Sequence, residues 1–127
     1  MLFAIGIAAI YYWLFIFTYQ INTNLLPNNF VVVVYDGGKV KKRCELHNTS
    51  SEYKALQNFI EKNKDGWSLD YQMKMPKASF MSRSFTIELR EKRMQISFLK
   101  QGSRGKTHVY REFNTYEVIP EVCGVSL

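Results

Sequence analysis

The first 35 residues of this 127-residue chain lack any charged side chain. All 17 Lys and Arg residues and all 11 Asp and Glu residues lie between Asp36 and Glu121. Residues 2–19 form one apolar run, LFAIGIAAIYYWLFIFTY, and extension to Ile21 gives about the 20 residues that a helix needs to cross a bilayer. We therefore expect a transmembrane anchor over 1–21, a linker over 22–29 and a folded domain over 30–127.

The apolar run also lacks the marks of a cleaved signal peptide, because no basic residue precedes it and no pair of small residues follows it. A cleaved signal and a buried core helix remain the alternatives. The N-terminal flank is short and the first basic side chain is Lys39, so we expect a single-pass signal-anchor protein whose domain lies outside the cytoplasm, in the periplasm or the exterior. A domain that faces the cytoplasm is the alternative.

Cysteine and histidine are scarce, with two of each. Cys44 and His47 lie three residues apart, and on a strand such positions point to opposite faces. Cys123 and His108 are distant and solitary, whereas a structural zinc site needs four ligands. We therefore predict no metal site.

The two cysteines, Cys44 and Cys123, have two possible states. In an oxidising compartment they can form a disulfide that attaches the C-terminal tail to the sheet, and in a reducing one they are two ordinary thiols.

Motifs for catalysis or phosphate binding are missing as well. The glycine-rich stretches at 36–38 and 102–105 precede strand patterns, whereas a phosphate loop is followed by Lys-Ser/Thr and a helix. No pair of carboxylates stands out for acid–base chemistry. We therefore predict no catalytic residue and no cofactor, and a protein that is not an enzyme.

Two local patterns are clear in the remaining chain. Apolar runs at 30–35 and 40–46 flank Asp36-Gly37-Gly38, which predicts a hairpin. On its second strand the alternation places Val40, Lys42, Cys44 and Leu46 on one face, and Lys41, Arg43 and Glu45 on the other.

Thr49-x-x-Glu52 has the spacing of a capping box, and the apolar stripe after it predicts an amphipathic helix that ends near Gly66. Further strands are expected at 67–73, 83–90, 93–99 and 107–113. The predicted fold class is α+β: after the transmembrane helix, an antiparallel sheet of about five to six strands, in the order ββαββββ, covered by one amphipathic helix.

Acidic residues are rare between Lys74 and Arg111, where ten basic residues stand against two glutamates. A basic surface attracts acidic proteins, anionic lipids or nucleic acids. The aromatic residues of this region fall on the inward strand phase, which does not favour nucleic acid. Residues on outward phases or in a turn form the predicted partner-binding set: Lys41, Arg43, Arg90, Arg93 and Arg104.

From these observations we expect a membrane-tethered, non-enzymatic interaction module that binds another protein, acidic in the leading interpretation. Inhibitors or immunity proteins and components of envelope complexes share this architecture. The alternative is a cytoplasm-facing module that binds anionic lipid or a protein at the inner membrane surface, and a small hydrolase is the third hypothesis. The sequence leaves the partner's identity and the oligomeric state open.

Overall fold

The computed structural model describes residues 5–7, 19–69, 74–99 and 105–127. Most of this part of the chain is antiparallel sheet, accompanied by one long helix. The elements, in chain order, are η1 (Thr23–Leu25), β1 (Asn29–Asp36), β2 (Lys39–His47), α2 (Ser51–Lys62), β3 (Ser68–Leu69), β4 (Ala78–Met81), β5 (Phe85–Arg90), β6 (Arg93–Leu99), β7 (Lys106–Glu112), α3 (Thr115–Val118), β8 (Glu121–Val122) and β9 (Val125–Ser126).

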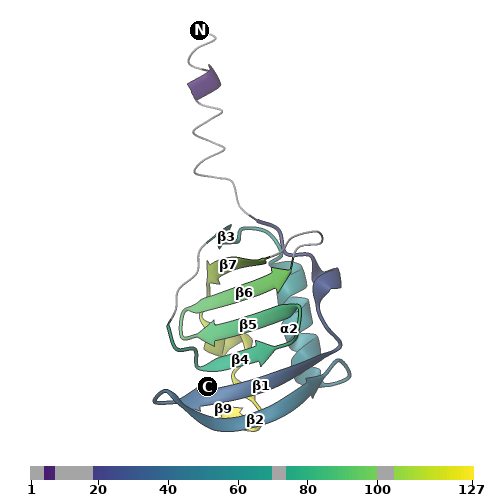
Figure 1. Ribbon diagram of the computed structural model, residues 1–127, viewed down its shortest axis with the longest axis vertical. Coiled ribbons are helices and arrows are strands. Elements are labelled where there is room, and N and C mark those ends of the chain that lie inside the picture. The colour runs from purple at the N-terminus through teal and green to yellow at the C-terminus, as the bar shows by residue number, and fades with distance from the viewer. Residues whose placement is uncertain (1–4, 8–18, 70–73, 100–104) are drawn as a thin grey trace.

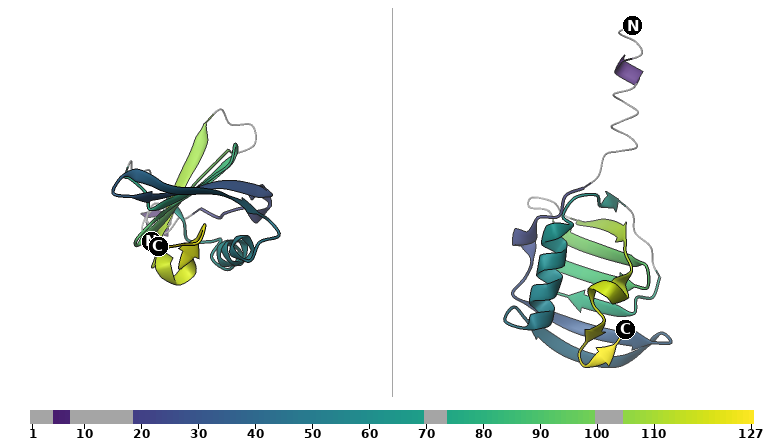
Figure 2. Two further views of the ribbon diagram at one scale, coloured as in Figure 1. Left: turned by 90° about the horizontal axis from the view of Figure 1, so that it is seen from below. Right: turned by 180° about the vertical axis from the view of Figure 1, so that it is seen from behind.

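Seven strands form one sheet in the order β2-β1-β4-β5-β6-β7-β3, and β8 and β9 form a separate two-stranded hairpin (Figure 1). The sheet is strongly twisted, so β1 and β2 lie at a steep angle to the central strands when seen from below (Figure 2, left). The prediction of five to six strands missed β4, because this strand is short and its first three residues are all buried, so exposure does not alternate along it.

The β1–β2 hairpin forms where the Asp-Gly-Gly turn predicts it. Gly37 and Gly38 both have positive φ, 57° and 81°, which a two-residue turn of this kind requires. The ladder then shifts register between Val34 and Tyr35, because Val34 pairs with Lys42 while Tyr35 pairs with Val40. Lys41 is therefore the extra residue of a β-bulge.

The bulge corrects the predicted faces of β2. Past a bulge, the alternation of side chains is shifted by one residue. Val40 leaves the face that holds Cys44 and Leu46, and its side chain is 56% exposed. The simple alternation of the sequence predicted Val40 on the inward face.

Helix α2 covers one face of the sheet, with the C-terminal tail beside it on that same face (Figure 2, right). The Ser50 hydroxyl caps the helix by accepting from the Tyr53 N–H at 3.2 Å. Leu56 and Ile60 are buried against the sheet. The core between the two layers is built from apolar side chains on the inward phase of β1, β4, β5, β6 and β7, together with the helix stripe.

The prediction of a membrane-spanning helix over 1–21 is corrected by the structure. Within the ranges that the structure describes, no helix combines the length and the apolar character that a bilayer crossing requires. Residues 1–4 and 8–18 of the predicted anchor lie outside the described residues. The predictions of a single-pass membrane protein and of a periplasmic or extracellular domain on such an anchor are withdrawn with it.

The end of the apolar run belongs to the folded domain. Tyr19 and Trp67 exchange two backbone hydrogen bonds, of 2.6 and 3.2 Å, and the Ile21 N–H donates to the Lys64 carbonyl at 2.7 Å. Ile21 is only 1% exposed and is part of the core. Apolar residues are equally suited to a bilayer and to a protein core, so hydropathy alone did not distinguish the two.

The C-terminal tail is fixed to the sheet by a disulfide between Cys44 and Cys123. The tail reverses direction at Cys123 and Gly124, both of which have positive φ, and this turn joins β8 to β9. Cys44 lies on the inward side of β2, where the tail packs. The sequence left the state of these two cysteines open.

Candidate functional site

The most strongly charged feature of the described surface is the first half of β2. Four of its first five residues are basic, and all four side chains are exposed: Lys39, Lys41, Lys42 and Arg43. We call these four residues the basic edge, because β2 is the outermost strand at one side of the sheet (Figure 1). Among the described residues, none of the four takes part in an ion pair.

The bulge distributes the basic edge over both faces of β2. Lys41 lines a hollow next to the C-terminal tail. Lys42 lies on the same side, because its Nζ would be 3.6 Å from a Cβ placed on Gly124 of the tail. Arg43 pairs with Val33 and lies on the opposite, outer face. The predicted pair of Lys41 and Arg43 is therefore on one strand but not on one face.

Arg90 and Arg93, also predicted to contact a partner, face each other across the β5–β6 ladder. The Arg90 guanidinium donates to the Lys74 carbonyl at 2.9 Å and lies 3.8 Å from the Glu88 carboxylate, and its side chain is only 12% exposed. The Arg93 guanidinium stacks 3.6 Å from the centre of the Tyr110 ring. Both arginines are thus engaged within the domain.

The five predicted residues do not form one patch. Arg43 and Arg90 are separated by β1 and β4, which corresponds to three strand spacings, on the order of 14 Å. Arg104 lies outside the described residues. Of the five predicted residues, Lys41 and Arg43 are therefore the two that the structure shows as exposed. They lie next to the exposed Lys39 and Lys42.

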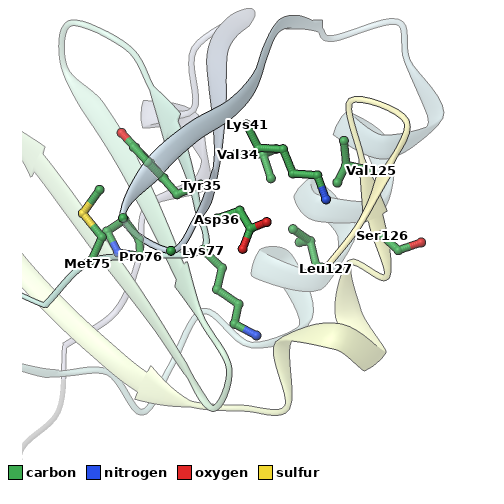
Figure 3. Close-up of a pocket in the computed structure, with 12 residues that line it drawn as sticks. Val34, Tyr35, Asp36, Lys41, Met75, Pro76, Lys77, Val125, Ser126 and Leu127 are labelled. Atoms are coloured by element: carbon green, nitrogen blue, oxygen red, sulfur yellow. The ribbon is translucent and has the colours of Figure 1, made fainter.

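A hollow of about 310 Å³ opens beside the basic edge, between the β1–β2 turn, residues 75–77 and the tail (Figure 3). The Asp36 carboxylate and the Lys41 ammonium group lie on the side of Leu127, whereas Tyr35 and Met75 extend away from them. Because a carboxylate, an ammonium group and aliphatic groups line the hollow together, it does not favour a ligand of one charge. The hollow is large enough for a side chain, and the periodicity of the sequence did not predict it.

The outer face of the sheet carries a polar group of a different kind. Ser97 Oγ and His108 Nδ1 lie 2.7 Å apart on the paired strands β6 and β7. Acyl transfer by such a pair also needs free N–H groups to hold an oxyanion. Both flanks of β6 are occupied by neighbouring strands, which use its backbone N–H groups in the ladders. The pair is therefore best explained as a cross-strand contact.

Within the described ranges, no three His, Cys, Asp or Glu side chains are grouped so that they could hold a metal ion. Comparison with protein-family models, curated proteins and solved structures finds no match to this chain. A proposal of function therefore rests on the chemistry of the described surface alone.

Proposed function

We propose that this domain is a non-enzymatic interaction module that holds an acidic protein partner through the basic edge of β2. The observation that carries the proposal is the set of four exposed cations within five residues, for which the described part of the domain supplies no anionic partner. Clustered charge of one sign creates a local potential that steers an oppositely charged partner to the surface.

The described surface favours a protein over single-stranded nucleic acid as the partner. Proteins that hold single strands stack the bases on exposed aromatic rings. The described Phe, Tyr and Trp side chains whose exposure is known are all buried or half-buried. The large apolar side chains that are exposed, such as Val40, are aliphatic.

The proposal is tested with a capped nine-residue peptide of alternating Glu and Thr as the acidic probe. We expect the peptide to bind the domain, and the affinity to fall steeply as salt is raised, because exposed charges are screened over about 10 Å at 0.1 M salt. Fluorescence anisotropy of the labelled peptide measures the affinity.

Two double variants with the same change in net charge locate the contact. Lys41→Glu with Arg43→Glu alters the basic edge, and Lys54→Glu with Lys62→Glu alters the exposed side of α2. We expect the first to abolish peptide binding and the second to leave most of it. Equal loss in both variants, or binding that ignores salt, would contradict the proposal.

A further inference from the structure

Strand β2 is a long strand at an open edge of the sheet. It has nine residues and pairs on one side with β1, while the opposite edge of the sheet is the two-residue strand β3 (Figure 1). Such an edge presents unpaired backbone N–H and C=O groups, to which another extended chain can pair.

The hydrogen bonds of β1 show which residues of β2 present unpaired backbone groups. The Tyr35 N–H donates to the Lys77 carbonyl, so the backbone groups of Tyr35 point toward β4. Along a strand this direction alternates, so Val33 and Val31 also point toward β4, away from β2. Their partners on β2 are Arg43 and Glu45.

Arg43 and Glu45 therefore lie at non-hydrogen-bonded positions of the β1–β2 ladder. Their N–H and C=O groups point away from β1, in the plane of the sheet and past its open edge. Both residues are exposed. The next residue with this phase, His47, already accepts at its carbonyl from the Ser50 N–H at 3.0 Å. The available stretch thus ends there, and together with the bulge at Lys41 this leaves about six residues, roughly 20 Å.

The side chains of this edge determine what can pair with it. A second copy of β2 would carry the same four basic residues against one glutamate, and the like net charge of the two strands opposes their pairing. Basic residues on an edge strand also keep neutral strands from adding to it. An acidic strand meets cations on both sides, Lys41 and Lys42 next to the tail and Arg43 on the outer face.

We infer that β2 binds the partner by strand addition: an extended acidic segment of about six residues pairs with the outward backbone groups of Arg43 and Glu45 as an additional strand of the sheet. This inference rests on the proposed function and specifies how the acidic partner is held. Main-chain hydrogen bonds hold the segment in register, and the basic edge selects its charge.

The decisive variant is Glu45→Pro, compared with Glu45→Ala. Both remove the same charge, but only proline also removes the outward N–H at position 45. Proline is tolerated on an edge strand where the N–H faces solvent, so the β1–β2 ladder is retained. We expect the Pro variant to bind the Glu-Thr peptide about tenfold more weakly than the Ala variant, because one main-chain hydrogen bond is lost and the ring obstructs its neighbour.

A second experiment changes the peptide and leaves the protein intact. N-methyl groups on the four central residues of the Glu-Thr peptide block both of its edges and leave its charge unchanged. We expect this peptide to lose most of its affinity for the wild-type domain. In hydrogen-exchange NMR, we expect the unmodified peptide to protect the amides of Arg43 and Glu45.

The outcomes separate the two proposals. If the unmodified peptide does not bind, both the proposed function and strand addition are wrong. If it binds with the expected salt dependence, but N-methylation, the Pro variant and amide exchange show no effect, strand addition alone is wrong. Should the Pro variant fail to fold, the methylated peptide and the exchange data still decide.

Discussion

At the scale of single residues, Tyr53 links the helix layer to the segment that enters the domain. Its hydroxyl donates to the Pro27 carbonyl at 2.5 Å, and the side chain is 5% exposed. Burial raises the pKa of the phenol above its ordinary value of 10.0. The folded state therefore holds the phenolic proton more tightly than the unfolded chain does.

This pKa has a consequence of known sign. Stability from Tyr53 is fully present below the unfolded-state pKa of 10.0 and is lost as the pH rises through the raised folded-state pKa. We expect Tyr53→Phe to lower the unfolding free energy by about 1 kcal/mol at neutral pH, and to lose less stability than wild type at about pH 11. Urea unfolding at both pH values measures this, with Tyr35→Phe as the control. An equal alkaline loss in wild type and Tyr53→Phe would refute the assignment.

At the scale of elements, α2 is held by its apolar stripe and not by its charged side. Leu56 is 1% exposed in the core, whereas Lys54 is exposed. We expect Leu56→Ala to cost about 2–5 kcal/mol through lost burial and the cavity left behind. Lys54→Ala is expected to change stability by less than about 0.5 kcal/mol. Urea denaturation of both variants gives the comparison, and similar costs at the two positions would contradict the packing described.

The elements that the sequence predicts best are those defined by local chemistry. The Asp-Gly-Gly turn and the helix stripe needed no tertiary information, and the observed helix cap is Ser50, one residue from the predicted Thr49. The bulge at Lys41 was not predictable, because it depends on the register between two strands. That single residue determines which cations share a face of the basic edge.

In the candidate site, too, the sequence predicted what depends on local pattern and missed what depends on tertiary contacts. Strand phase placed Arg90 and Arg93 on the outward side, and they do lie on the face opposite α2. Phase says nothing about neighbours, however, and the Lys74 carbonyl and the Tyr110 ring that engage these arginines come from other parts of the chain. Exposed cations and internally engaged cations look alike in a sequence.

At the scale of the whole molecule, the Cys44–Cys123 bridge closes a loop of 79 residues. A crosslink over such a separation restricts the unfolded chain, and its loss typically costs about 2–4 kcal/mol. We expect Cys44→Ser with Cys123→Ser to lower the unfolding free energy by that amount. Reductant should lower the stability of the wild type but leave the double variant unchanged. Thermal unfolding with and without dithiothreitol measures both, and a reductant effect on the double variant would show that the comparison is unsound.

The segment before β1 also contributes to the whole domain. Residues 19–27 supply the Tyr19–Trp67 bridge, the buried Ile21 side chain and the Pro27 carbonyl that Tyr53 donates to. We expect a chain that starts at residue 28 to be less stable than one that starts at residue 19 by about 2–3 kcal/mol, chiefly from the loss of Ile21 burial. Urea unfolding of the two chains compares them, and equal midpoints would show that the segment adds no stability.

The Cys44–Cys123 disulfide also governs how the domain responds to mechanical load. When tension is applied between residues 19 and 127, it passes from Cys44 directly to Cys123, and everything between these two residues is shielded. Only residues 19–44, which include β1 and β2 up to Cys44, and the last few residues can then be drawn out, roughly thirty residues or on the order of 100 Å of chain. After reduction the whole domain can extend, on the order of 380 Å. The strand that carries the basic edge is thus at the border between the extensible and the shielded parts of the protein.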